Sequence, residues 1–277
     1  MRTLSLLANY FCNMSDSDST YVLPQAIHHW PVQSTLTDRR TTTFTTAAEV
    51  QNVFIAVGGT KFTITYDLVA GRSPLLEDAL QECGGSVVLV DEDPKVFSNY
   101  LLFLEGGAAR VEEEEQRRLR AEEVGRRERG IKAKTDMFAR LAEIWILSDS
   151  FEDHHACNLI IDSLLDLHQN ARSLVLSAEA INITFASSTP FAPLQKLIID
   201  LLVLEAGPSE YEVLRAQGVT QEVWFAVSWE MKGFVEEVGS GPGRWEDALG
   251  RGIGAWPRCD WHFFGDEGVG CLSCGRG

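Results

Sequence analysis

The sequence lacks a long hydrophobic segment. Its most apolar run, Leu197–Leu204, spans only eight residues and contains Asp200. A helix that crosses a bilayer needs about 20 consecutive, mostly apolar residues. The short apolar stretch near the start contains Asn9 and is followed by no clear small-residue cleavage site. We therefore expect neither a membrane-spanning nor a secreted protein.

Positive charge is also scarce. The chain has 24 Lys and Arg residues against 40 Asp and Glu residues, which gives a formal net charge of -16. Such a chain repels the phosphate backbone of nucleic acids, whose non-specific binding depends on Lys and Arg. Nucleic acid is therefore not an expected partner.

Cysteine is sparse and scattered. The six cysteines form no recognisable disulfide framework, and Cys83 and Cys157 fall inside patterned segments, where a buried free thiol is common. A reducing compartment, the cytoplasm or the nucleus, fits this usage best.

What the chain does have is 45% hydrophobic residues, enough to bury a core. The first 50 residues are not expected to be part of that core. They are rich in Ser, Thr, Asp and Asn and sustain no hydrophobic period, so 1–50 is predicted to be a mostly disordered leader.

Residues 58–61 (GGTK) lie between two stretches of strand length. The stretch 53–57 is continuously apolar, whereas 62–66 alternates apolar and polar residues. A phosphate-binding loop would need G-x-x-x-x-G-K-[ST] running into a helix, but here the glycines are adjacent and a strand follows. The pattern predicts a β-hairpin rather than a nucleotide site.

The periodicity beyond the hairpin predicts mainly helices. A helix is expected within 67–80, a third strand at 86–90, and a helix that starts at Asp93-Pro94 and ends at Gly106-Gly107. Residues 112–134 contain seven acidic and eight basic residues and read as a solvated, charged segment. Further helices are predicted at 137–148, 156–167, 177–186, 193–205 and 220–238, and four large side chains are expected in the core: Trp145, Phe151, Leu164 and Leu167.

Three motifs follow one another in the first half of the chain. The first lies within 62–74 and consists of Phe62, Ile64, Asp67, Leu68, Arg72, Ser73 and Pro74. The second is DEDPKVF at 91–97, and the third is LAEIWILSDSF at 141–151. Together they resemble the BTB (POZ) fold in its fungal BTB-domain form.

The resemblance implies an α+β architecture. A BTB/POZ domain, a small mixed sheet with packed helical hairpins, is expected over 51–170 and would be interrupted by the charged insertion 107–134. An α-helical C-terminal extension over 171–238 and a Gly-rich Cys/His tail over 239–277 would follow.

The resemblance also implies a non-enzymatic protein-protein interaction module that self-associates as a homodimer, docks partner proteins, or does both. Three residues depart from the family pattern. Thr65 and Tyr66 stand where the family usually has His and Lys, in a region that helps form its dimer interface, and Leu76 replaces an aromatic residue.

Some family members dock onto the cullin scaffold of a ubiquitin ligase through an apolar-x-acid element near the third strand. Val90 and Glu92 fit that element, which makes a ligase adaptor an alternative function. The same residues also read as the acidic first turn of a capped helix, and this plainer interpretation is favoured.

The C-terminal cysteines suggest a third alternative. Cys259, His262, Cys271 and Cys274 form C-x2-H-x8-C-x2-C, a spacing that suits a tetrahedral, structural zinc site. Free thiols on a Gly-rich tail are the favoured interpretation. No catalytic motif is found in the sequence, and neither an enzyme nor an obligatory cofactor is expected.

Overall fold

The computed structural model of the chain describes residues 21–23, 52–121, 126–171, 176–188 and 192–238. The chain divides into two compact units, residues 1–94 and 95–277. The first unit holds a sheet with a short helix, and the second is helical, so the α+β class expected from the sequence is confirmed. Among the described residues, no helix combines the length and apolarity that crossing a bilayer requires.

The sheet of the first unit has the strand order β1-β4-β2-β3. Its strands are β1 (Tyr21–Leu23), β2 (Asn52–Val57), β3 (Thr60–Thr65) and β4 (Ser86–Leu89). β2 pairs antiparallel with β3, and β4 pairs parallel with both β1 and β2. The segment expected to be a mostly disordered leader therefore contributes β1, while the rest of it lies outside the described residues.

The predicted hairpin is confirmed. Val57 pairs with Thr60, so the loop consists of Gly58 and Gly59 alone, with φ angles of 50° and 84°. Positive φ at both central residues matches the turn whose twist suits a two-residue hairpin, and glycine adopts it without steric penalty. Lys61 lies within β3, with its Nζ 4.2 Å from the centre of the Phe54 ring. Lys61 and Phe54 both lie on the solvent-facing side of the hairpin.

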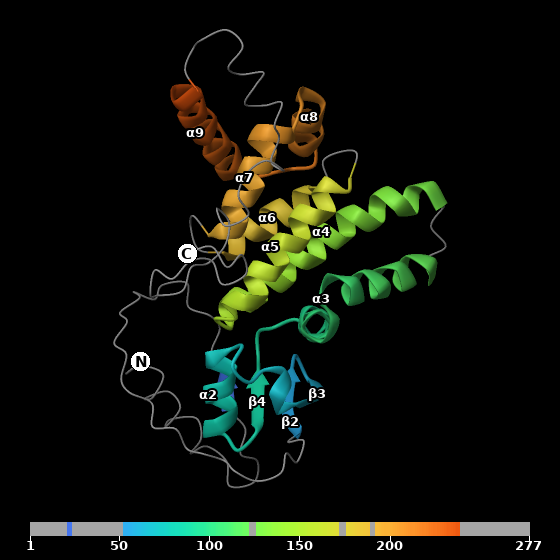
Figure 1. The fold of residues 1–277 in the computed structure, drawn as a ribbon, viewed down its shortest axis with the longest axis vertical. Helices are drawn as coiled ribbons and strands as arrows, with labels where there is room; N and C mark the ends of the chain where they lie inside the picture. Colours follow the sequence, from blue (N-terminus) through green and yellow to red (C-terminus); the bar gives the residue numbers. More distant parts are fainter. Residues whose placement is uncertain (1–20, 24–51, 122–125, 172–175, 189–191, 239–277) are drawn as a thin grey trace. The chain divides into compact units, whose positions relative to one another are not determined.

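The other side of the sheet forms the core of this unit. Alternate residues of β2 are buried, and the paired residues of β4 continue the same face. After a 3-10 turn (Tyr66–Leu68), helix α2 (Pro74–Glu82) packs against β1 and β4 (Figure 1). Ser73 caps this helix by accepting a hydrogen bond from the Leu76 amide at 3.2 Å. The buried apolar side chains of this core are Val53, Ile55, Val57, Ile64, Val69, Leu76, Ala79, Leu80, Val87 and Leu89.

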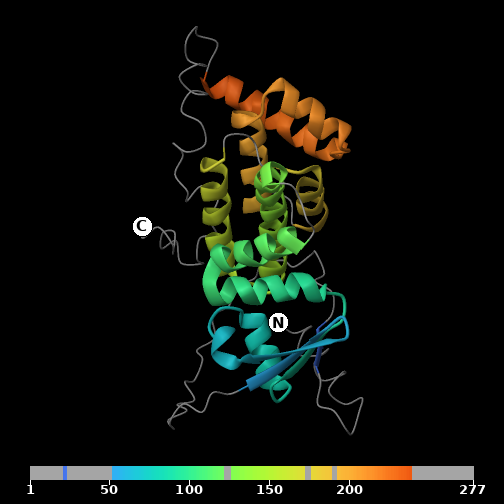
Figure 2. The same ribbon diagram turned by 90° about the vertical axis from the view of Figure 1, so that its right-hand side faces the viewer.

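The second unit consists of α3 (Pro94–Ala121), α4 (Arg126–Ser150), α5 (His154–Gln169), α6 (Ala178–Ser187), α7 (Pro193–Glu205), α8 (Pro208–Ala216) and α9 (Gln221–Val238). α4 packs against α5 and α6, and α7 packs against α9 (Figures 1 and 2). Trp145, Phe151 and Leu164 are buried as predicted, whereas Leu167 is only half-buried. Helix α8 was not predicted from the sequence.

Helix α3 bends sharply at the glycine pair that was predicted to end it. Gly106 has φ -151° and ψ 17°, and Gly107 has φ 65° and ψ -160°, so neither residue is helical. The Gly107 conformation is in practice accessible only to glycine. The chain then resumes a helix instead of entering a solvated segment. Val111, Glu115 and Leu119 are all at most 5% exposed, which corrects the expectation that this stretch buries almost nothing.

The first half of α3 is fixed to the turn between α4 and α5. The rings of Phe97, Tyr100 and Phe151 pack together with centroid separations of 5.7 to 6.3 Å. The Tyr100 hydroxyl donates a 2.9 Å hydrogen bond to Asp153, which also caps α5 by accepting from the Ala156 amide at 2.9 Å. Asp153 is fully buried, and these bonds satisfy both of its oxygens.

The bend of α3 at Gly106 and Gly107, which we call the elbow, yields a first prediction. Gly107→Ala should lower the free energy of unfolding by about 1–3 kcal/mol, because alanine is strained at this φ and ψ even though no described residue lies within 4 Å of the added methyl group. Urea denaturation followed by circular dichroism measures the change.

Gly233→Ala in α9 is the matched control. Gly233 lies in a helix, and no described residue comes within 4 Å of the position of an added methyl group, so alanine there should raise the unfolding free energy by about 0.5–1 kcal/mol. If Gly107→Ala behaves like Gly233→Ala, the elbow does not depend on the glycine conformation.

Candidate functional site

A cavity of about 390 Å³ lies in the elbow of α3. Each half of the helix contributes four residues at positions i, i+3, i+4 and i+7, which is the spacing of a single helical face. The bend turns the two faces toward a shared space, and α4 contributes one further side chain. The lining residues are Lys95, Ser98, Asn99 and Leu102 from the first half, Val111, Glu114, Glu115 and Arg118 from the second, and Arg140 from α4.

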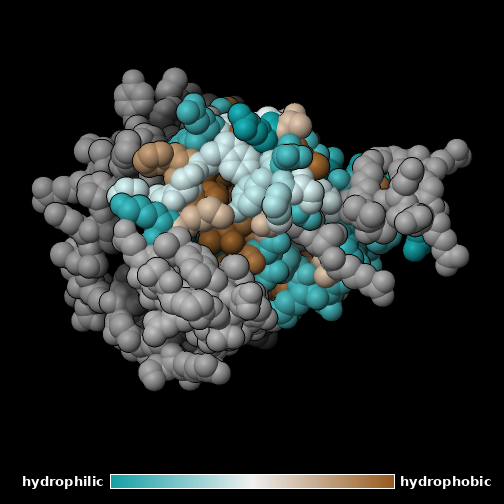
Figure 3. All heavy atoms as spheres, turned by 90° about the horizontal axis from the view of Figure 1, so that it is seen from above, coloured by the Kyte–Doolittle hydropathy of each residue, from teal (hydrophilic) through white to brown (hydrophobic). Residues whose placement is uncertain are grey.

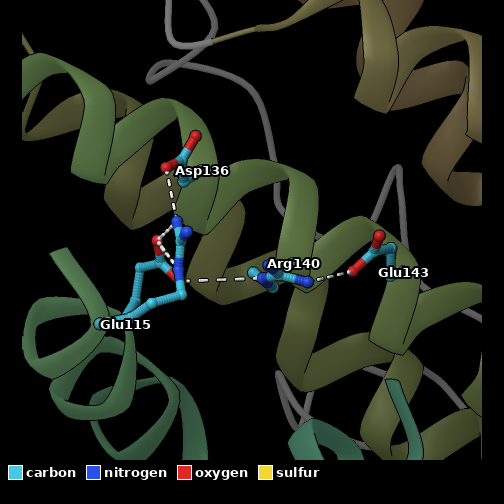
Figure 4. A network of polar contacts seen from close by, with 5 residues as sticks. Glu115, Asp136, Arg140 and Glu143 are labelled. Atoms are coloured by element: carbon cyan, nitrogen blue, oxygen red, sulfur yellow. Dashed lines mark hydrogen bonds and ion pairs between the residues drawn. The ribbon is translucent and has the colours of Figure 1, made fainter. Parts of the chain in front are cut away.

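A buried carboxylate, that of Glu115, holds the second half of α3 against α4 (Figure 4). Both of its oxygens accept hydrogen bonds from Nε of Arg118 at 3.1 Å, and Arg118 Nη2 also donates to Asp136 at 2.9 Å. Arg140 approaches from α4, with its Nε 3.7 Å from Glu115 and its Nη1 donating to Glu143 at 3.2 Å. This set of five charged residues is called the elbow network below.

The environment shifts the pKa values of two of these acids in opposite directions. Burial disfavours the charged form of Glu115, but hydrogen bonds from Arg118 and the charges of Arg118 and Arg140 outweigh it and lower the pKa of this carboxyl. For Glu143, burial is stronger than the attraction of Arg140 and raises the pKa. Of these two acids, Glu115 is therefore the one whose ionised form the fold favours.

One polar side chain of the cavity is left without a partner. Asn99 is 8% exposed, and its Nδ2 makes no hydrogen bond within the described part of the chain. A buried amide without an acceptor destabilises the fold by about 1–3 kcal/mol, so such groups are rare unless something else satisfies them. Asn99 belongs to the cavity lining. The cavity therefore combines fixed charges with an unused hydrogen-bond donor.

Sequence reasoning missed the elbow network, because a run of four glutamates beside arginines reads as a solvated surface. A weak signal was present. Val111, Glu115 and Leu119 recur at intervals of four, which places them on one face of a helix. Only that face is buried.

Helix α9 carries a second feature, an exposed aromatic surface. Phe225 is 71% exposed and Trp229 is 67% exposed, although Val223 and Val227 on another face of the same helix are buried. Glu222 and Lys232 continue the exposed face at helical spacing, and Lys232 Nζ lies 5.6 Å from the Trp229 ring centre. We call Phe225 and Trp229, with Glu222 and Lys232 at their flanks, the α9 aromatic surface. The view in Figure 3, taken from the end where α8 and α9 lie in Figure 1, shows hydrophobic residues among hydrophilic ones.

The candidate cullin-docking element, Val90 with Glu92, lies directly after β4. Val90 is 53% exposed, Asp91 is exposed and Glu92 is half-buried. Burial, followed by the nearby charge of Asp91, raises the pKa of Glu92. The first unit therefore presents Val90 to solvent, while Glu92 is partly withdrawn from it.

The residues of the predicted zinc site, Cys259, His262, Cys271 and Cys274, lie outside the described residues. Within the described ranges, no group of three or more His, Cys, Asp or Glu side chains is arranged to hold a metal ion. Cys83 and Cys157 are buried free thiols, as the sequence suggested. Both interpretations of the tail, free thiols and the alternative zinc site, therefore stay predictions.

Comparisons with protein-family models, with curated proteins and with solved structures find no match to this chain.

The elbow network gives a second prediction, on stability and pH. Glu115→Gln should lower the free energy of unfolding at pH 7 by about 1–3 kcal/mol, because it leaves Arg118 and Arg140 partly buried with less compensating charge. The folded pKa of Glu115 is depressed, so its contribution is complete above the ordinary value of 4.5 and is lost as the pH falls through the folded value. Denaturation curves of the wild type and the variant should therefore converge in acid.

Glu114→Gln is the control for this measurement. Glu114 is the neighbouring residue, 45% exposed and paired with Arg117 on the surface, so its loss should change stability by no more than about 0.5 kcal/mol. A constant difference between the wild type and Glu115→Gln from pH 7 to pH 3 would contradict the proposed role of the ionised carboxylate.

Proposed function

We propose that this chain is a non-enzymatic protein-association module of BTB type. The sequence motifs that resemble that family motivate the fold assignment, and the paired β2–β3 hairpin followed by α2 and β4 is compatible with it. The observation that carries the functional proposal is the α9 aromatic surface, with Phe225 and Trp229 one helical turn apart and mostly exposed.

Two exposed large aromatic side chains on one helix face are unusual for a surface without a partner. Trp and Phe are the side chains that contribute most when they become buried in an interface, and Trp is among the commonest hot-spot residues. They are not needed to attach α9, because Val223 and Val227 bury that helix against its neighbours. Because α9 is already packed, its backbone is ordered before a partner binds, so binding costs little backbone entropy.

The charge of the chain indicates what such a partner should look like. The formal net charge is -16, and exposed Glu222 and Glu230 lie along α9 near the aromatic residues. The complementary surface is an apolar groove with a basic rim on a different protein, because two copies of this chain repel one another at low salt. Self-association is the other expectation from the resemblance, and the experiment described next distinguishes it from binding of a different protein.

The third prediction tests this surface. Proteins captured by the wild-type chain should be compared with those captured by a chain carrying Phe225→Ser and Trp229→Ser, and light scattering should report the mass of each chain. A partner that depends on the surface should bind the double variant at least about 30-fold more weakly, and the wild-type complex should weaken with added salt. Loss of a wild-type dimer in the variant would identify the partner as a second copy.

Leu159→Ser in α5 is the matched control, since Leu159 is an exposed apolar residue, at 36%, without an aromatic neighbour on its helix face. It should leave both capture and mass unchanged. Both variants replace exposed side chains, so their unfolding free energies should remain within about 0.5 kcal/mol of the wild type per substitution. Identical partners and masses for the wild type and the double variant would overturn the proposal.

A second candidate function, docking to a cullin scaffold as a ligase adaptor, is favoured by the exposure of Val90. An exposed valine at the end of a strand, followed by acidic residues, offers an apolar contact with adjacent charge. This function would use the first unit rather than α9.

The fourth prediction tests that candidate. If it holds, the wild-type chain should copurify with a cullin scaffold, and Val90→Asp combined with Glu92→Lys should remove at least about nine-tenths of the bound scaffold. Glu82→Lys, an exposed charge reversal at the end of α2, is the control and should copurify like the wild type. Equal recovery with the double variant would exclude Val90 and Glu92 as the docking element.

A further inference from the structure

We propose that the elbow cavity of α3 is a binding site for a small organic anion, a molecule with one carboxylate or phosphate group on a short apolar body. The inference concerns the second unit only and does not depend on the protein-association function. It rests on the cavity, the arginine held in its lining and its unsatisfied donor.

The first step is the donor set. Asn99 is nine-tenths buried, lines the cavity and has an Nδ2 without a partner in the described residues. The terminal amide of asparagine turns about a broad, two-fold torsion, so its N–H groups can face the cavity when an acceptor arrives there. The hydroxyl of Ser98, its neighbour in the lining, adds a second donor.

The second step is Arg140. Its side chain is 17% exposed, and within the described part of the chain its contacts run from Nη1 to Glu143 and from Nε to Glu115. A guanidinium group carries five N–H donors in a plane, so Nη2 remains available to a ligand oxygen. Figure 4 shows Arg140 between Glu115 and Glu143, which hold the side chain in one orientation. A fixed guanidinium binds an oxyanion with little loss of side-chain entropy.

The third step is charge. Lys95, Arg118 and Arg140 bring positive charge to the lining of a chain whose net charge is -16, and Asp136 and Glu143 beside the cavity pair with the two arginines. Glu115 is committed to Arg118 and Arg140, and Glu114 is paired with Arg117. The Nη2 of Arg140 and the Nδ2 of Asn99 are donors, so the ligand must present acceptor oxygens, and hydrogen bonds from a guanidinium are strongest to an oxygen that carries negative charge.

The fourth step is size and polarity. A cavity of about 390 Å³ accommodates a small organic molecule and is larger than an inorganic ion requires. Leu102 and Val111 supply the apolar part of the lining, one from each half of α3. A short apolar body between these residues would place the anionic group toward Arg140 and Asn99.

The fifth prediction uses three probes of similar size, benzoate, phenyl phosphate and the neutral benzamide, titrated into the full-length chain and followed by ligand-observed NMR. At least one anion should bind the wild type, with benzamide at least tenfold weaker. Asn99→Leu and Arg140→Gln should each weaken binding of that anion by about tenfold or more, since each removes a hydrogen bond to a charged group. Whichever anion binds more tightly identifies the carboxylate or the phosphate form of the ligand.

Asn99→Leu also separates binding from folding. Replacing an unsatisfied buried amide by an apolar group of similar shape is neutral or stabilising for the free protein, so the melting temperature without ligand should stay the same or rise while binding is lost. Arg110→Gln, which changes an exposed arginine of α3 paired with Glu113, is the control and should bind like the wild type.

Two results would overturn the inference. One is a folded wild-type chain that binds neither anion at millimolar concentration, and the other is wild-type affinity in both Asn99→Leu and Arg140→Gln. Partner capture by the α9 aromatic surface should be the same in all of these variants, so a failure of one proposal is distinguishable from a failure of the other.

Discussion

The ionised carboxylate of Glu115 is the interaction on which the helical unit's most unusual feature depends. A buried carboxylate is unfavourable unless it is paired, and here Arg118 on its own helix and Arg140 on α4 supply the compensation. This pairing holds the second half of α3 in place, while Tyr100 and Asp153 hold the first half. The bend between the two anchored halves is possible because Gly107 adopts a conformation that other residues avoid.

The two functional features of the helical unit differ in physical character. The elbow cavity is concave and lined by charged residues that hydrogen bonds hold in place, which suits recognition of a small polar molecule. The α9 aromatic surface is open and presents two large side chains from a helix that is already packed on its other face, which suits a protein partner. Because the two features share no residues, substitutions can separate them cleanly.

Local rules predicted the elements with a strong, local cause. Two adjacent glycines between apolar stretches defined the hairpin, and the expected helix at 193–205 has the observed bounds of α7, since Pro193 starts it. The same rules failed where burial depends on distant partners. The residues after Gly107 looked solvated because their compensating charges, Asp136 and Arg140, lie on another helix. Phe225 and Trp229 received no interpretation from the sequence, because periodicity does not reveal how exposed an aromatic side chain of α9 is.

The sequence by itself therefore determined the α+β class, the hairpin, the position of the α3 break and most of the helices, because each follows from contacts within a few residues of the chain. The tertiary structure alone decided that the chain continues beyond Gly107 as a packed helix, that Glu115 is buried with its charge retained, and that Asn99 faces a cavity without a partner. These properties depend on which surfaces meet in space. Burial, and with it the energy of every polar group, is set by residues far away in the sequence.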